Sequence, residues 1–462
     1  MRVLCLIKEP FLFLDRKQQL SLRKNILVTY GSQIINTGLA FFSSVFITRL
    51  LGTDGRGEYS LFTNSLQLFV IWLGFSLPVS IVYFVASEKI NKNRIFSTML
   101  IFCLLTTLLV VLLLAVLNIT GWLWIAFPEN YRSFDWQLFF LIQFVLMQLN
   151  GIINAYLNAF KIFTPQARFA SAMALLSLIV WSLLYFKVIV LPWSGFQLVV
   201  LVSFFLSLPL WFFGFYLLRK KRLIVFTSRI LNTKEFTMVM KFAFIAYLCN
   251  AMQFLSYRMD FWFVDFFHGK SSLGVYSLAV ALAQLFWILP NAMAPVFFSY
   301  TSGAKNDKML ERVVKYAHIT FVVSCIGALL FLVFAYWVIP FLYGSEFSAA
   351  GWMIAILLLG VIPFTVTTIL AAFFAGTNRL LVNFRTSFIG LIFAAAGYIL
   401  LIPSMGAKGA CIASVISYNA SNVYIYYKFY KTTGNKIWKI NPLAVLQNMK
   451  ASFLQLAVLK KS

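Results

Sequence analysis

Charged residues are scarce in this chain of 462 residues, of which they make up only 11%. Hydrophobic residues account for 61%, and the mean hydropathy is +0.88. A soluble globular chain of this size could not cover so much apolar surface with so few charges. The shortage of charge therefore excludes a soluble protein and predicts an all-α protein that crosses a membrane many times.

Residues that commonly build catalytic or metal sites are also few. The chain has two histidines and five cysteines, and none of the cysteines forms a C-x-x-C or other metal-binding spacing. No G-x-x-x-x-G-K-[ST] loop for nucleotide phosphates occurs. We therefore expect a protein that is not an enzyme, has no ATPase of its own and needs no metal or other cofactor.

Acidic residues are the scarcest charged type. Thirteen Asp and Glu compare with 38 Lys and Arg, so the formal net charge is +25. A strongly basic balance can indicate a nucleic-acid partner, but only if the basic side chains gather on a solvated face. The position of the charges along the chain decides whether they indicate a nucleic-acid partner or the orientation of a membrane protein.

Gaps between charged residues locate the membrane spans, because a helix that crosses the bilayer needs about 20 mostly apolar residues. Eleven charge-free windows are long enough, and a further apolar run at 242–266 contains Arg258 and Asp260. The sequence therefore predicts twelve transmembrane helices. The windows are 25–48, 59–87, 95–128, 136–160, 169–186, 188–218, 271–304, 316–345, 347–378, 386–407 and 409–427.

The loops between these spans predict the orientation, since Lys and Arg are enriched in cytoplasmic loops. If the N-terminus is cytoplasmic, the cytoplasmic segments hold 31 basic and six acidic residues, whereas the opposite side holds six of each. The whole surplus then lies on the cytoplasmic side, and both termini are cytoplasmic. Binding to anionic lipid explains the basic segments without nucleic acid as a partner.

An internal repeat relates the two halves of the chain. Residues 57–61 (Gly-Glu-Tyr-Ser-Leu) recur as 274–278 (Gly-Val-Tyr-Ser-Leu), and Gly52 corresponds to Gly269 at the same offset. Because both copies begin on the same side, the repeat predicts two parallel six-helix lobes around a pseudo-two-fold axis along the membrane normal. The expected segments are an N-terminal tail (1–24), an N-lobe (25–218), a basic linker (219–241), a C-lobe (242–430) and a basic, interfacial tail (431–462).

Prolines interrupt the two helices that carry the repeat. Pro78 lies in the second half of the second span, and Pro290 and Pro295 lie in the second half of the eighth. Proline frees a backbone carbonyl and bends a helix, so these residues are candidate gating elements. A fixed bend that only serves packing is an equally good interpretation.

Uncharged polar side chains recur at helical spacing in three predicted spans. Within each span they fall in an arc of about 80°. Such faces suit a wet cavity that binds polyols, and they equally suit hydrogen bonds between helices. The residues are Gln33 and Asn36 in the first span, Gln143, Asn150 and Asn154 in the fourth, and Asn250, Gln253 and Tyr257 in the seventh.

The seventh span also contains a cation, Arg258, and a carboxylate, Asp260. Residues two apart on a helix do not face each other, whereas Arg258 shares a stripe with Asp265. Arg258 could form an ion pair with another helix, or it could contact a phosphate, which its planar guanidinium binds well. Asp260 is the candidate residue for coupling to ions or protons, because it is the carboxylate well inside a span.

Several stretches resemble one membrane transporter family. Residues 49–59 (Arg-Leu-Leu-Gly-Thr-Asp-Gly-Arg-Gly-Glu-Tyr) resemble the signature that ends the first span of the bacterial polysaccharide transporter family. Residues 273–279, 342–350 and 406–410, and the pair of Arg258 and Asp260, are similar to later features of that family. The resemblance covers about residues 25–430. The family comprises O-antigen and exopolysaccharide flippases of the multidrug/oligosaccharidyl-lipid/polysaccharide (MOP) superfamily.

The resemblance implies a MATE-like bundle in the bacterial inner membrane. It implies a flippase that moves undecaprenyl-pyrophosphate-linked oligosaccharide units for lipopolysaccharide or exopolysaccharide biosynthesis by alternating access. Arg258, with Arg49 near the outer mouth, would contact the pyrophosphate, and the polar stripes would contact the sugars. Its partners would be the lipid-linked substrate, membrane lipid, and the polysaccharide polymerase and chain-length machinery.

Two other transport functions remain open at this point. A MATE-like drug or cation antiporter would need carboxylates in its cavity, and this chain offers one clear intramembrane acid. A peptidoglycan-precursor flippase would handle a similar headgroup, and we would expect more cationic residues within its first lobe.

Overall fold

The computed structural model describes residues 16–434 except 226, 292, 295–306 and 378, with side chains from Gly31 onward except at 307–309. The described residues form helices and no strand, as expected for a chain surrounded by lipid, where each backbone polar group needs a partner within its own segment. The α-helices are α2 (Arg16–Gly74), α3 (Leu77–Ala86), α4 (Lys92–Ile119), α5 (Phe134–Ala159), α6 (Phe163–Tyr185), α7 (Gly195–Lys220), α8 (Thr233–Gln284), α10 (Asp307–Tyr343), α11 (Ala350–Gly376) and α12 (Leu380–Thr433). The short 3-10 helices are η2 (Trp122–Ile125), η3 (Glu129–Tyr131), η4 (Leu285–Trp287) and η5 (Ser345–Phe347).

Three of these helices are too long for a single membrane crossing. Helices α2, α8 and α12 contain 59, 52 and 54 residues, so each would extend roughly 80–90 Å if it were straight. Each is broken at one glycine with positive φ, namely Gly52, Gly269 and Gly406. A residue without Cβ adopts this left-handed conformation at no steric cost.

Hydrogen bonds across the breaks show that the chain doubles back there. Arg56 Nη1 donates to Thr48 Oγ1 over 3.1 Å, although eight residues separate them. The hydroxyls of Tyr398 and Ser414 are 3.1 Å apart across 16 residues of α12. In a straight helix these separations would be about 12 and 24 Å. Helices α2, α8 and α12 are therefore helical hairpins.

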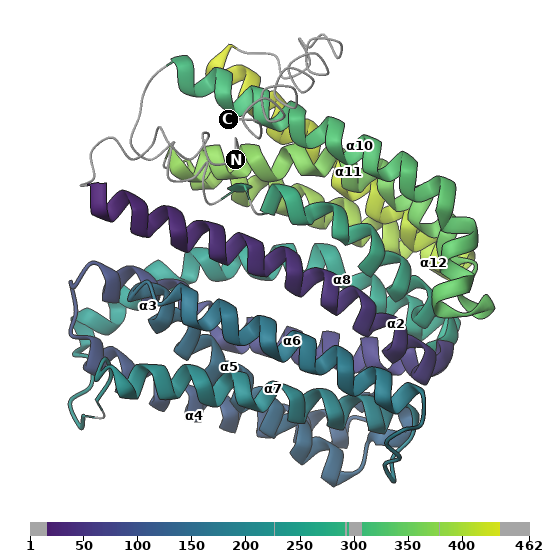
Figure 1. Ribbon diagram of the computed structural model, residues 1–462, viewed down its shortest axis with the longest axis horizontal. Helices are drawn as coiled ribbons and strands as arrows, with labels where there is room; N and C mark the ends of the chain where they lie inside the picture. The colour runs from purple at the N-terminus through teal and green to yellow at the C-terminus, as the bar shows by residue number, and fades with distance from the viewer. Residues whose placement is uncertain (1–15, 226, 292, 295–306, 378, 435–462) are drawn as a thin grey trace, which may run out of the picture.

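The helices pack as two groups, which lie in the lower and upper parts of Figure 1. Buried residues between 51 and 243 form two hydrophobic clusters, whose members come from α2 to α7 and the beginning of α8. Two further clusters lie almost wholly between 261 and 429, in α8 and in α10 to α12. Helix α8 therefore belongs to both groups, since Val239 and Ala243 pack with the first and Phe261 with the second.

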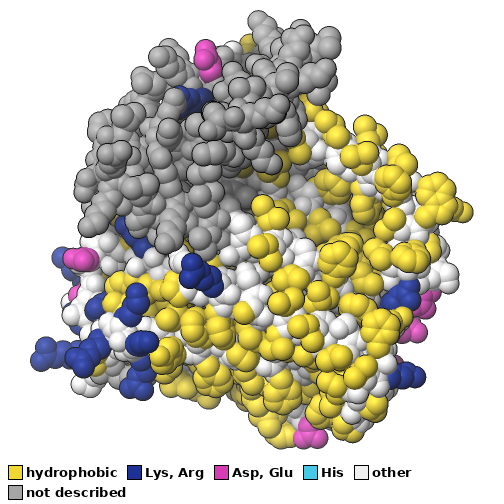
Figure 2. Space-filling model, in the orientation of Figure 1, with side chains coloured by type: hydrophobic (Ala, Val, Ile, Leu, Met, Phe, Trp, Pro, Cys, Tyr) yellow, Lys and Arg dark blue, Asp and Glu magenta, His cyan; other side chains and the backbone are white. Residues whose placement is uncertain are grey.

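The surface of the described residues carries its charges at the two ends. Figure 2 shows dark-blue Lys and Arg side chains gathered at the left end, and hydrophobic side chains over most of the middle. On α4, large aliphatic side chains such as Leu104, Leu108 and Leu112 are more than 60% exposed. Nine helices among the described residues are long and apolar enough to cross a membrane. An apolar band between charged ends is the surface expected of a membrane-embedded bundle.

The repeated motifs meet each other at the contact between the two halves. A Cβ added to Gly57 would lie 2.0 Å from the carbonyl oxygen of Lys270, and one added to Gly274 would lie 1.9 Å from that of Thr53. Between them, Ser60 Oγ donates to Ser277 Oγ over 2.8 Å, across exactly the repeat offset of 217 residues. The contact is thus reciprocal, and only glycine permits so close an approach.

Introduced cysteines can test this contact. We expect Ser60→Cys combined with Ser277→Cys to form a disulfide under mild oxidation, because the two side chains already touch. Adding Gly57→Ala should lower both the yield of the linked peptide and the melting temperature of the purified protein. Gly55→Ala is the matched control, since its Cβ would meet only the Leu51 side chain, at 3.2 Å. Mass spectrometry of the peptides gives the yield, and an unchanged yield with Gly57→Ala would contradict the packing described.

Candidate functional site

Arg258 lies on the first arm of the α8 hairpin with its charge uncompensated by a carboxylate. Its Nη2 donates to Gln284 Oε1 on the second arm over 2.9 Å, and its guanidinium lies 5.1 Å from the centre of the Phe261 ring. Its carbonyl oxygen accepts a hydrogen bond from Asn64 of α2. Among the described residues, Arg258 forms no ion pair. A half-buried guanidinium with donors to spare is therefore available to an anion at the contact between the halves.

Asp265, which shares a helical stripe with Arg258, forms an ion pair with another cation. Asp265 Oδ2 pairs with Lys270 Nζ at 2.5 Å. The pair spans the glycine break at Gly269, where the chain turns and brings Lys270 back toward Asp265. Arg258 lies two helical turns from Asp265, and the two form no ion pair among the described residues.

Asp260 lies in a buried network of hydroxyl groups in the C-terminal half. Its side chain accepts hydrogen bonds from the Tyr276 hydroxyl and, at 3.0 Å, from the Phe261 amide. Ser414 lies 3.4 Å from the Tyr276 hydroxyl, and Tyr398 extends the network from there. Asp260 is only 2% exposed. Burying a charged carboxylate this deeply is costly, and these hydrogen bonds offset part of the cost.

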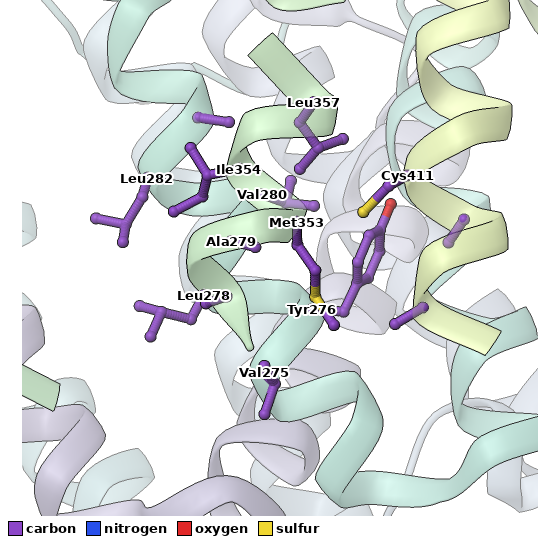
Figure 3. Packing of buried hydrophobic residues seen from close by; sticks show 14 of the residues in the cluster. Val275, Tyr276, Leu278, Ala279, Val280, Leu282, Met353, Ile354, Leu357 and Cys411 are labelled. Carbon is purple, nitrogen blue, oxygen red and sulfur yellow. The ribbon is translucent and has the colours of Figure 1, made fainter. Parts of the chain in front are cut away.

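The surroundings of Tyr276 are drawn in Figure 3. Its ring lies among buried residues of α8, α11 and α12, with Met353 and Cys411 beside it. The Asp260 network is therefore enclosed by hydrophobic packing within the C-terminal group of helices.

The polar stripe predicted on the seventh span separates into two environments. Asn250 is exposed and donates to Ser76 Oγ, just before α3, over 3.0 Å. Gln253 is also exposed, and its Nε2 donates to the Tyr257 hydroxyl over 3.1 Å. The ring of Tyr257 packs instead against aromatic residues of the C-terminal group: Trp287, Phe364 and Tyr418.

Carboxamides of the fourth span form a hydrogen-bonded chain. Asn154 Nδ2 donates to Asn150 Oδ1 over 3.0 Å, and Gln166 Nε2 of α6 donates to Asn154 Oδ1 over 2.5 Å. Gln143 is half-buried on α5, about two turns before Asn150. Sequence reasoning missed Gln166, because it considered stripes on single helices, and no spacing within α6 marks a residue that bonds across to α5.

The polar stripes of α2 and α8 occupy equivalent positions in the repeat. At the offset of 217 residues, Gln33 corresponds to Asn250 and Asn36 to Gln253. Further along, Phe41 corresponds to Arg258 and Ser43 to Asp260, so uncharged residues of the N-terminal half match charged residues of the C-terminal half. The two halves thus share their carboxamides, whereas the charged pair occurs in the C-terminal half.

Arg49 joins three helices near the Gly52 turn. Its Nε donates to the Leu342 carbonyl over 2.6 Å, its Nη1 donates to the Tyr185 hydroxyl over 2.9 Å, and its Nη2 donates to the Phe341 carbonyl. Arginine suits the end of a helix such as α10, where carbonyls lack helical partners. In this conformation Arg49 holds α2 to α10 and α6, and its contact with substrate stays a prediction.

The candidate gating prolines lie beside breaks in the helices. Pro78 is in the first turn of α3, and the break precedes it at Phe75 and Ser76, both with φ of 48°. Pro290 is buried just after η4, and η4 interrupts the helical segment that continues from α8. Pro295 lies outside the described residues. Movement at these positions stays a prediction.

Removing one hydroxyl tests the Asp260 network. Tyr276→Phe takes away a donor from a buried carboxylate, and such a loss costs about 1–3 kcal/mol in the free energy of unfolding. We therefore expect a lower melting temperature for the purified variant in detergent. Tyr427→Phe, on the exposed surface of α12, is the matched control and should leave the melting temperature unchanged. Equal melting temperatures for the two variants would contradict the network.

Three solved structures with a similar fold are those of membrane transporters. The lipid II flippase MurJ, in an inward closed conformation, matches with a TM-score of 0.67 and 16% identity over 93% of this chain and 92% of that chain. The MATE transporter VcmN of Vibrio cholerae matches with 0.61 and 14% over 90% and 98%. A MOP superfamily transporter from Pyrococcus furiosus matches with 0.61 and 15% over 89% and 96%. At these identities the likeness establishes the fold, which is that of MurJ and the MATE transporters.

Sequence comparison adds the family. No significant match occurs among curated proteins. Residues 22–301 match the family described as polysaccharide biosynthesis protein, and this range includes the repeat contact, Arg258 and Asp260. It covers more than half of the chain. The match shows that the chain belongs to the polysaccharide biosynthesis protein family, and its fold is shared with membrane transporters.

Proposed function

We propose that the protein is a flippase for undecaprenyl-pyrophosphate-linked oligosaccharide units, the repeats of an O-antigen or an exopolysaccharide. One observation carries the proposal: a chain of a polysaccharide biosynthesis family has the fold of a transporter. A polysaccharide precursor that must cross a membrane needs such a protein. Arg258 supports the headgroup assignment, because its guanidinium has no carboxylate partner among the described residues and suits a pyrophosphate.

The proposed topology has twelve crossings in the bacterial inner membrane, with both termini in the cytoplasm. The hairpins α2, α8 and α12 each supply two crossings, and α4 to α7, α10 and α11 supply one each. The N-lobe is 25–218 and the C-lobe 242–430, joined by the basic linker 219–241. In this orientation the Gly52, Gly269 and Gly406 turns face the periplasm, and the basic loops face the cytoplasm.

The proposed mechanism is alternating access between the lobes. The reciprocal glycine contact closes the periplasmic side, while the pyrophosphate binds Arg258 and the sugars contact the carboxamides of α2, α5 and α8. Opening of that side releases the headgroup to the periplasmic leaflet. Asp260 couples this movement to an ion or proton gradient, since its charge inside the hydroxyl network requires a cation or a proton to balance it.

A peptidoglycan-precursor flippase is the second candidate, favoured by the extent of the match to the lipid II flippase. A gene deletion distinguishes the two. We expect a lipid-linked surface glycan to accumulate on the inner leaflet, while peptidoglycan synthesis continues. Accumulation of the peptidoglycan precursor would support the second candidate. Normal surface glycan together with raised sensitivity to cationic dyes would instead indicate a drug antiporter.

Substitution of Arg258 tests the headgroup contact. Arg258→Lys keeps the charge but loses the planar pair of donors, so we expect flipping to slow by about tenfold. Arg258→Gln removes the charge and should slow flipping further. Proteoliposomes containing a fluorescent lipid-linked oligosaccharide give the rate, and Arg168→Gln, at an exposed position of α6, is the control. If both Arg258 variants fold and flip at the wild-type rate, Arg258 does not bind the pyrophosphate.

A further inference from the structure

A cavity of about 470 Å³ lies between the first arm of α2, the end of α5 and the beginning of α6. No charged residue lines it among the described residues, and Phe163 is its one aromatic side chain. Its polar side chains are Ser32, Gln33, Asn36, Thr37, Asn158 and Gln166. Carboxamides and hydroxyls can each both donate and accept hydrogen bonds, as the hydroxyls of a sugar can.

The Gln166 side chain is held in place on the cavity lining. Its Nε2 donates to Asn154 Oδ1, and Asn154 in turn donates to Asn150. This chain fixes the orientation of the Gln166 carboxamide and leaves its Oε1 without a hydrogen bond from any described residue. An oriented acceptor on the lining of a polar cavity is a group prepared to meet a donor.

Asn36 contributes a second carboxamide to the lining, from α2. Its Oδ1 is buried and has no hydrogen-bond partner within the described part of the chain. Buried polar atoms are rarely left in this state, because the loss of hydration is not recovered. A turn of the Asn36 side chain would bring this oxygen to the cavity surface. The lining therefore offers two carboxamides, those of Asn36 and Gln166, whose oxygens lack a donor from the described residues.

The cavity also lies at a suitable depth relative to Arg258. In the repeat, Asn36 corresponds to Gln253, which precedes Arg258 by five residues on α8. Five residues are about 8 Å along a helix. A sugar joined to a pyrophosphate at Arg258 would extend toward the end of the bundle at which the cavity lies.

We propose that this cavity is a subsite for an uncharged sugar residue of the lipid-linked glycan, with Asn36 and Gln166 accepting hydrogen bonds from its hydroxyl groups. Asn154 is a positioning residue that orients Gln166. The inference rests on the proposed flippase function and adds to it the class of sugar bound. A lining without Lys or Arg offers nothing to balance a carboxylate, so uronic acids and sulfated sugars are poor ligands here.

Binding of two lipids to the full-length protein in nanodiscs tests the subsite. The probes are undecaprenyl pyrophosphate and undecaprenyl-pyrophosphoryl-N-acetylglucosamine, and the readout is the ratio of their dissociation constants. We expect the wild-type protein to prefer the glycosylated lipid. Asn36→Ala and Gln166→Ala should each reduce this preference by about fivefold, the effect of one lost hydrogen bond, while affinity for undecaprenyl pyrophosphate stays unchanged.

Two further variants separate recognition from folding. Gln166→Met keeps the approximate size of the side chain and removes the carboxamide acceptor, so it should also lose the preference while keeping the wild-type melting temperature to within a few degrees. Asn118→Ala removes an exposed carboxamide near the end of α4. It should leave the preference intact.

The possible outcomes distinguish this inference from the function on which it rests. If the wild-type protein and the Asn36 and Gln166 variants prefer the glycosylated lipid equally, the cavity is not a sugar subsite, although the flippase function stands. If the wild-type protein binds both lipids equally, sugar recognition is overturned and only the headgroup contact remains. If it binds neither lipid, the flippase function and the subsite are both overturned.

Discussion

The close approach of two glycines to two carbonyl groups determines how the halves of this molecule meet. Gly57 packs on the Lys270 carbonyl and Gly274 on the Thr53 carbonyl, with the Ser60 and Ser277 hydroxyls between them. Other features follow from this contact. It brings the Gly52 and Gly269 turns to the same end, aligns the polar stripes of α2 and α8, and sets Arg258 against Asn64 of the other half. A larger side chain at either glycine would move all of these together.

Much of the fold could be predicted from the sequence, because lipid imposes simple rules. Charge-free stretches indicated membrane helices, and the described residues are helical throughout their long apolar segments. The repeat indicated related halves, and its two motifs are in contact. The site was less predictable. Arg49 binds main-chain carbonyls of α10, which no side-chain pattern reveals, and Asp265 pairs with Lys270 across a turn that regular helical spacing ignores. Gln166 acts through a neighbouring helix, so its position became meaningful only in three dimensions.

The two halves have kept a common geometry but differ in their chemistry. Equivalent carboxamides occur on α2 and α8, yet Phe41 and Ser43 occupy the positions that correspond to Arg258 and Asp260. The N-terminal half therefore offers uncharged hydrogen-bonding groups, and the C-terminal half offers one cation and one buried acid. For the substrate we propose, with a sugar at one end and a pyrophosphate at the other, such a division would place the pyrophosphate against the C-terminal half.

Several polar contacts between the halves share a property with an evolutionary consequence. Arg49, Asn64 and Trp262 each donate a hydrogen bond to a main-chain carbonyl across the contact. A carbonyl is present whatever residue carries it, so the accepting positions can change identity without loss of the bond. Divergence is then restrained at the donors and at the glycines, while their partners are free to vary. Relatives with few identical residues could in this way keep the same contact between the two halves.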